Sequence, residues 1–233
     1  MCMRSRWRWS AMETVDELTG DEGGVWRVTT VGSSHIINLI RGTITRIPGI
    51  GRSASINDVE RPLRSLDACR VGEIGRWTMM SDDFLTDYYW QRTSTVQRIE
   101  LLTGLELGKA NTEVALQNIA ASDGLYTVPE AAEMLDVSEE EVREMLAAGQ
   151  LIGLTWRDEL VFPGCQFGPD RDEVAAFVQP LIAAAIEFDY SLRGLTFWLY
   201  SPTTYFGGSQ PVTFVDDPDI LIESFRAQAG VEW

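Results

Sequence analysis

The chain has 233 residues, of which 45% are hydrophobic, so it is long enough for one large domain or two smaller ones and can bury a core. Its net charge of −16 argues against a protein that binds nucleic acid through phosphate contacts alone. Residues 1–80 carry 11 basic and 9 acidic residues, net +2, whereas residues 81–233 carry 8 and 26, net −18. The acidic excess therefore belongs to the second part of the chain.

The cysteines and the single histidine limit the chemistry that the chain can perform. Cys2, Cys69 and Cys165 are dispersed and odd in number, which argues against a disulfide framework or a zinc knuckle and favours a cytoplasmic setting. Any Ser-His-Asp or Cys-His scheme has to use His35. No run reaches about 18 apolar residues, so no membrane-spanning segment is expected. We expect a protein without cofactor or metal that is not an enzyme.

The N-terminal region is predicted to be rich in β-strands. A flexible lead-in over 1–22, with short helical potential at 12–18, precedes a small β-rich domain over 23–103. Within it, β-branched and aromatic runs between Gly and Ser turns predict several strands. These lie at 25–31, 35–40, 43–47 and 75–80. The spacing of apolar residues over 93–102 instead predicts a helix.

Two groups of residues in this region admit a functional interpretation. His35 with Asp58 and Asp67 would form an acid–base set, although a lone histidine on a strand is more often structural. The arginines, together with Trp26 and Trp77, would suit nucleic acid through phosphate contact and stacking, or would pair with the acidic part of the chain. The low net charge of +2 favours the second interpretation. The arginines are Arg27, Arg41, Arg46, Arg52, Arg61, Arg64, Arg70 and Arg76.

Two helix starts with the same signature are predicted in the middle of the chain. Thr127 and Ser138 are each followed three residues later by a glutamate, which is typical of a capping box, and Gly149 marks a helix end. A helix is predicted before them, and a β-pair after them. These elements lie at 112–121, and at 152–156 and 160–162.

This stretch resembles the MerR/excisionase-type DNA-binding domain, through Thr127–Ser138, Val142-Arg143 and Ala148–Leu151. The resemblance covers about 124–167 and implies a winged helix-turn-helix over 104–168, with Arg143 and Arg157 as DNA-contacting residues. The glutamates that open the second helix favour the helix dipole and repel phosphate. Two interpretations stay open: a structural or protein-contact platform, or a module that still binds operator DNA within a complex.

The last part of the chain carries a second, more specific resemblance. Phe197–Pro202, Gly207–Val212 and Asp217–Leu221 follow the order of the toxin-binding domain of Xre/MbcA/ParS-type antitoxins over about 181–233. The resemblance implies an all-helical domain over 169–233, which in that family covers a cognate toxin and blocks its active site with the tail. The residues that it implies as toxin-binding are Trp198, Tyr200, Tyr205, Phe206, Phe225 and Trp233.

The sequence thus predicts an α+β protein with a small β-rich N-terminal domain, a winged helix-turn-helix and a C-terminal all-helical domain. We expect an antitoxin that binds and occludes a cognate toxin and regulates its own promoter. The alternative is a DNA-binding transcriptional regulator or accessory protein without a toxin. The expected partners are the toxin and operator DNA, with no membrane, and the sequence leaves open whether the protein is a monomer or a homo-oligomer.

Overall fold

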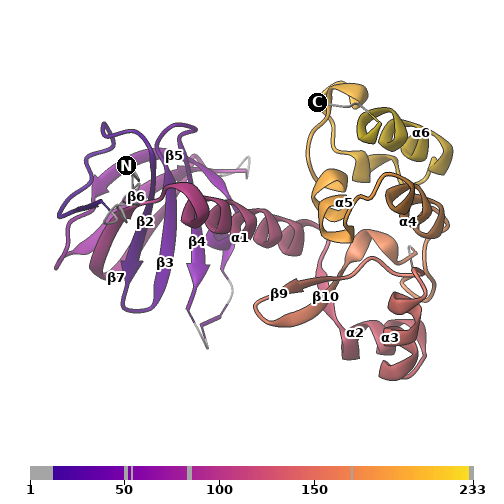
Figure 1. The fold of residues 1–233 in the computed structure, drawn as a ribbon. Helices are drawn as coiled ribbons and strands as arrows, with labels where there is room; N and C mark the ends of the chain where they lie inside the picture. The colour runs from indigo at the N-terminus through magenta and orange to yellow at the C-terminus, as the bar shows by residue number, and fades with distance from the viewer. Residues whose placement is uncertain (1–12, 50–51, 54, 83–85, 169, 231–233) are drawn as a thin grey trace, which may run out of the picture. The chain divides into compact units, whose positions relative to one another are not determined.

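Figure 1 shows a computed structural model of the chain, which describes residues 13–49, 52–53, 55–82, 86–168 and 170–230. The chain divides into two compact units, residues 1–118 and residues 119–233. Each unit buries hydrophobic clusters of its own. Among the described residues, no helix is both long and apolar enough to cross a membrane.

The first unit is built on a seven-stranded antiparallel sheet that closes on itself. The strand order is β1-β7-β2-β3-β4-β5-β6, and β6 pairs in turn with β7, so strands β2 to β7 form a ring. Closure depends on β7, whose 14 residues pair with β6 through the first half and with β2 through the second. The elements are β1 (Thr14–Val15), β2 (Val25–Thr30), β3 (Ser33–Asn38), β4 (Thr43–Pro48), η1 (Ile56–Asp58), β5 (Arg61–Ala68), β6 (Ile74–Met80) and β7 (Tyr88–Leu101).

Alternation along the strands gives this sheet two apolar surfaces. Ile37 on β3 points into the ring and is fully buried, whereas its neighbour Ile36 faces outward. Helix α1 (Gly104–Ser122) covers this outward surface, where its Ala110 and Val114 pack with Ile36 (Figure 1). Each large apolar side chain buried here contributes roughly 1.5–3 kcal/mol, which stabilises both layers.

The predicted fold class is wrong. The sequence pattern indicated a small β-rich domain ahead of mainly helical parts, whereas a seven-stranded sheet dominates the N-terminal half and a second sheet lies in the other unit. Within residues 12–18, expected to be helical, Thr14–Val15 form the short strand β1, and Met12 lies outside the described residues. Strand β5 was not anticipated. The sheet is larger than predicted because the segment at 93–102, expected to be a helix, belongs to β7.

A β-bulge explains why that segment has helix-like spacing. Thr29 of β2 pairs with Arg98, but Thr30 pairs with Val96, so β7 has one extra residue at this point. The extra residue reverses the alternation, and Val96 and Ile99, three positions apart, both point into the ring. The spacing of three between Val96 and Ile99 therefore arises from a bulge in a strand and not from a helical period.

The second unit combines a three-stranded antiparallel sheet, in the order β8-β10-β9, with five α-helices. In Figure 1, α4, α5 and α6 gather apart from α2 and α3. Both predicted capping boxes are confirmed, since Glu130 accepts from the Thr127 N–H at 2.7 Å and Glu141 from the Ser138 N–H at 2.8 Å. The elements are β8 (Leu125–Thr127), α2 (Val128–Leu135), α3 (Glu139–Ala147), β9 (Leu154–Trp156), β10 (Glu159–Pro163), η2 (Gly164–Gln166), α4 (Val178–Glu187), α5 (Leu192–Leu199), η3 (Thr204–Phe206), η4 (Pro211–Phe214) and α6 (Pro218–Ala229), with the end of α1 ahead of them.

Candidate functional site

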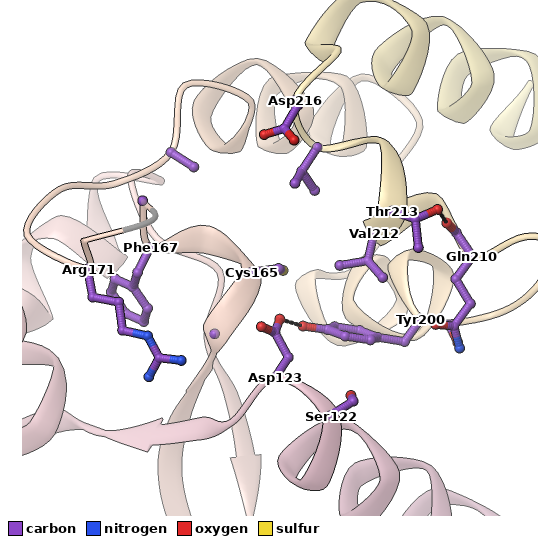
Figure 2. A pocket seen from close by; sticks show the side chains of 14 residues that line it. Ser122, Asp123, Cys165, Phe167, Arg171, Tyr200, Gln210, Val212, Thr213 and Asp216 are labelled. Carbon is purple, nitrogen blue, oxygen red and sulfur yellow. Dashed lines mark hydrogen bonds between the residues drawn. The ribbon is translucent and has the colours of Figure 1, made fainter. Parts of the chain in front are cut away.

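A hollow in the second unit surrounds Tyr200, one of the residues that the antitoxin resemblance implies to be toxin-binding (Figure 2). Its volume is about 550 Å³. The end of α1, η2 with residues of the loop that follows it, the C-terminus of α5 and the η4 segment all contribute to its wall. The polar side chains that line it include Asp123, Cys165, Arg171, Tyr200, Gln210 and Asp216.

Hydrogen bonds hold Tyr200 in the wall of the hollow. Its hydroxyl donates to the carboxylate of Asp123, which lies 77 residues earlier in the chain (Figure 2). The Gln210 side chain donates to the Tyr200 carbonyl oxygen at 2.7 Å. Burial raises the pKa of the Tyr200 hydroxyl well above its ordinary value, so the group remains a proton donor at neutral pH. Tyr200 therefore ties the end of α5 to the residue that follows α1.

The other polar groups of the hollow suit binding rather than nucleophilic catalysis. Cys165 points into it in Figure 2, but burial raises the pKa of its thiol to about 12, which keeps the sulfur protonated at neutral pH. Arg171 lies over the Tyr126 ring, with its guanidinium 4.9 Å from the ring centroid. Within the described part of the chain, no group of three His, Cys, Asp or Glu residues could hold a metal ion.

Beside the hollow, the chain presents an exposed aromatic turn over residues 203–209. Gly207 and Gly208 have φ values of 64° and 93°, a left-handed backbone that glycine adopts without strain and that forms a tight turn here. The Phe206 ring stacks on Phe214 with centroids 4.1 Å apart, and Tyr205 remains 47% exposed. The stack anchors the turn, and Tyr205 is left exposed to solvent.

Two of the residues expected to contact a toxin belong to the core instead. Trp198 is 8% exposed and Phe225 1%, and their rings pack edge to face at 5.0 Å. The Trp198 indole N–H also donates to Gln228 at 3.3 Å. Because α5 and α6 turn these apolar faces toward each other, both side chains contribute to the packing between the two helices. Trp233 lies outside the described residues.

The two arginines expected to contact DNA are engaged within the chain. Arg143 forms ion pairs with Glu139 at 2.9 Å and Glu140 at 3.9 Å, so the first turn of α3 neutralises its one basic residue. Arg157 lies in the turn between β9 and β10, with its guanidinium 4.3 Å from the centroid of the Trp156 ring. Exposed ion pairs of this kind contribute only ~0–1 kcal/mol, so Arg143 can exchange partners readily.

The acid–base set imagined around His35 is not assembled, and the structural interpretation of His35 is confirmed. His35 is fully buried, and burial, reinforced by the charge of Arg46, lowers its pKa to about 3. Asp58 pairs with Arg46 at 2.6 Å, and Asp67 stands exposed on β5. With so low a pKa and no exposure to solvent, His35 is poorly suited to accept a proton from a substrate at neutral pH.

Sequence reasoning missed Asp123, Cys165 and Arg171 as parts of the hollow. No local pattern marks them, because the Tyr200–Asp123 hydrogen bond joins positions far apart in the chain. The sequence pattern did mark the neighbouring turn, through Gly207-Gly208 and the aromatic residues Tyr205 and Phe206.

Comparisons with known proteins leave the family open. No protein-family model matches the chain, and a search of curated proteins finds no significant match. A solved structure titled "NMR structure of Rv2175c" is similar to part of the fold, with 20% sequence identity and a TM-score of 0.43 over 46% of this chain and 82% of that chain. A similarity of this size carries no inference about function.

Proposed function

We propose that the second unit binds a partner protein and acts as an antitoxin that occludes its toxin. The observation that carries this proposal is the exposed aromatic turn beside the 550 Å³ hollow, with Tyr205 at 47% exposure. Large aromatic side chains often supply much of the binding energy of protein interfaces, and a neighbouring hollow can receive a side chain of the partner. Tyr205 and Phe206 thus remain the proposed toxin-binding residues.

The charge of this unit supports a basic protein partner over DNA. Residues 119–233 contain 20 acidic and 5 basic residues, net −15. Such a surface accelerates association with a basic protein and repels the phosphate backbone. The glutamates of α3 place part of this charge on the element that would otherwise enter a DNA groove.

Co-expression with the product of the adjacent open reading frame tests the proposal. We expect that product to arrest growth when expressed alone, and the full chain to relieve the arrest and co-elute with it in size-exclusion chromatography. Tyr205→Ala should weaken the complex about tenfold or more, as expected for an aromatic anchor. Ile186→Ala is the matched control, because Ile186 is a large apolar residue that is 70% exposed on α4, outside the aromatic turn in sequence. A harmless neighbour that forms no complex contradicts the proposal.

A second candidate is a DNA-binding regulator without a toxin, for which the α2–α3 pair and the β9–β10 hairpin supply the elements. It is favoured by the weakness of the exposed ion pairs of Arg143, which a phosphate can replace. A mobility shift on upstream DNA, run with and without the neighbouring protein, separates the two candidates. Binding by the chain alone that falls steeply with salt and is lost in Arg143→Ala favours the regulator.

A further inference from the structure

The outer surface of β6 and β7 in the first unit carries cationic and aromatic side chains together. In the register of these strands, Arg76 lies opposite Arg92, Thr78 opposite Trp90 and Met80 opposite Tyr88. On β6, Arg76, Thr78 and Met80 alternate with Trp77 and Met79, which are buried inside the ring. Arg76, Thr78 and Met80 therefore point outward, and so do the residues opposite them on β7. Arg64 of the neighbouring strand β5 joins them through its contact with the Tyr88 ring. We call the set Arg64, Arg76, Tyr88, Trp90 and Arg92 the arginine–aromatic face.

The aromatic rings of this face are open to solvent. Trp90 is 69% exposed and Tyr88 42%, and the Arg64 guanidinium lies 4.4 Å from the centroid of the Tyr88 ring. The tryptophans first considered for stacking, Trp26 and Trp77, are only 3% and 1% exposed and belong to the core. The stacking groups of this unit are therefore Trp90 and Tyr88, which the sequence pattern did not single out.

The arginines of the face differ from most of the other described arginines of the same unit. Arg27, Arg46 and Arg61 have carboxylate partners at 3.1, 2.6 and 2.9 Å. Over the described residues, by contrast, the three arginines of the face form no ion pair with a carboxylate. Arg76 and Arg92 are moreover directly opposed, an arrangement of like charges that destabilises a strand pair. An anion bound between them would relieve this repulsion.

We propose that the arginine–aromatic face binds single-stranded nucleic acid, with Arg64, Arg76 and Arg92 contacting phosphates and bases stacking on Trp90 and Tyr88. Cationic groups beside exposed rings are the elements with which proteins bind unpaired strands. In a duplex the bases stack on each other, so none is available to stack on Trp90. A peptide of acidic residues would pair with the guanidinium groups but has no aromatic base to stack on Trp90 or Tyr88. This proposal concerns the first unit and is independent of the antitoxin proposal for the second.

Fluorescence anisotropy of a labelled oligothymidylate with the full chain tests the proposal. We expect saturable binding that weakens with salt, and a duplex of equal length should bind more weakly. Trp90→Ala should reduce affinity about 5- to 150-fold, the range for loss of one stacked base. The paired variant Arg76→Ala/Arg92→Ala should reduce the slope of log affinity against log salt by about 1.4, because each phosphate contact on a single strand contributes about 0.7.

Matched controls come from exposed residues outside the face. Ile40→Ala, at 76% exposure, controls for the loss of an apolar side chain, and Arg41→Ala for the loss of a cation, since that side chain is 67% exposed. Both should bind like the unaltered chain, and thermal melting should show every variant folded. Arg76→Ala without ligand should melt no lower than the unaltered chain, because it removes a like-charge pair. The proposal is overturned if Trp90→Ala binds normally, if the duplex binds as tightly, or if polyglutamate binds as tightly as the oligonucleotide.

Discussion

At the scale of single residues, His35 shows how burial controls charge. Its ring lies inside the closed sheet, edge to face with Trp77 at 4.8 Å, and its Nε2 is 3.2 Å from the Ser33 hydroxyl. Its Nδ1 has no hydrogen-bond partner among the described residues. A protonated imidazole here would be desolvated and would face the positive charge of Arg46, so the neutral form is strongly favoured.

The burial of His35 predicts a loss of stability in acid. The unfolded chain takes up a proton near pH 6.5, whereas the folded chain does so only near 3, so the free energy of unfolding falls as pH is lowered through this window. The slope from this group is about 1.4 kcal/mol per pH unit. Urea unfolding of the unaltered chain and His35→Phe, at about pH 7 and about pH 4.5, checks this. Equal pH dependence in both proteins would rule the explanation out.

At the scale of elements, neighbouring residues determine where a helix starts, whereas a strand depends on the distant segment with which it pairs. The Ser138 hydroxyl accepts from the Glu141 N–H at 3.2 Å, and the Glu141 carboxylate accepts from the Ser138 N–H at 2.8 Å. The hydrogen bond from the Ser138 N–H lowers the pKa of Glu141, which keeps that carboxylate charged where the helix dipole favours it. In β7, the bulge opposite Thr29 and Thr30 gives a strand an apolar spacing that resembles a helix.

The capping box of α3 predicts a measurable cost for its removal. Ser138→Ala should lower the free energy of unfolding by about 1 kcal/mol, because it leaves an N-terminal N–H of the helix without its side-chain acceptor. Ser201→Ala serves as the control, since Ser201 is exposed and caps no helix. Chemical denaturation followed by circular dichroism measures both. A cost as small as that of the control would show that the cap contributes nothing to stability.

At the scale of the whole molecule, charge is divided between the two units. Residues 1–118 hold 14 basic and 15 acidic residues and are nearly neutral, whereas residues 119–233 hold 5 and 20. Almost all of the net charge of −16 therefore lies in the second unit. The near-neutral unit still carries the arginine–aromatic face, because most of its other arginines are neutralised by carboxylate partners.

The acidic charge of the second unit predicts that its association with a basic partner depends on salt. Association of the chain with the neighbouring gene product should slow about tenfold or more between about 0.05 M and about 0.5 M salt, because screening removes the attraction of the acidic unit. Asp216→Asn, which neutralises one carboxylate of the hollow, should reduce the association rate at low salt and have little effect at high salt. Stopped-flow measurements provide the rates. A rate that does not depend on salt would contradict an electrostatic role for this unit.

Some features of the protein could be predicted from the sequence because they depend on residues close together in the chain. The capping boxes at Thr127 and Ser138 and the tight turn at Gly207 each involve a few neighbouring positions, and all three are present in the structure. The charge division is likewise a property of composition along the chain.

Features that depend on distant segments were decided only by the tertiary structure. Closure of the sheet requires β7 to pair with both β2 and β6, and this pairing turns Trp77 inward and Trp90 outward although both are strand tryptophans. The same holds for Trp198, which α6 covers, and for Tyr200, whose partner Asp123 lies 77 residues away. Local residues determine where a helix starts and where the backbone turns. Which face of an element is buried depends instead on what packs against it, and only the folded chain brings those surfaces together.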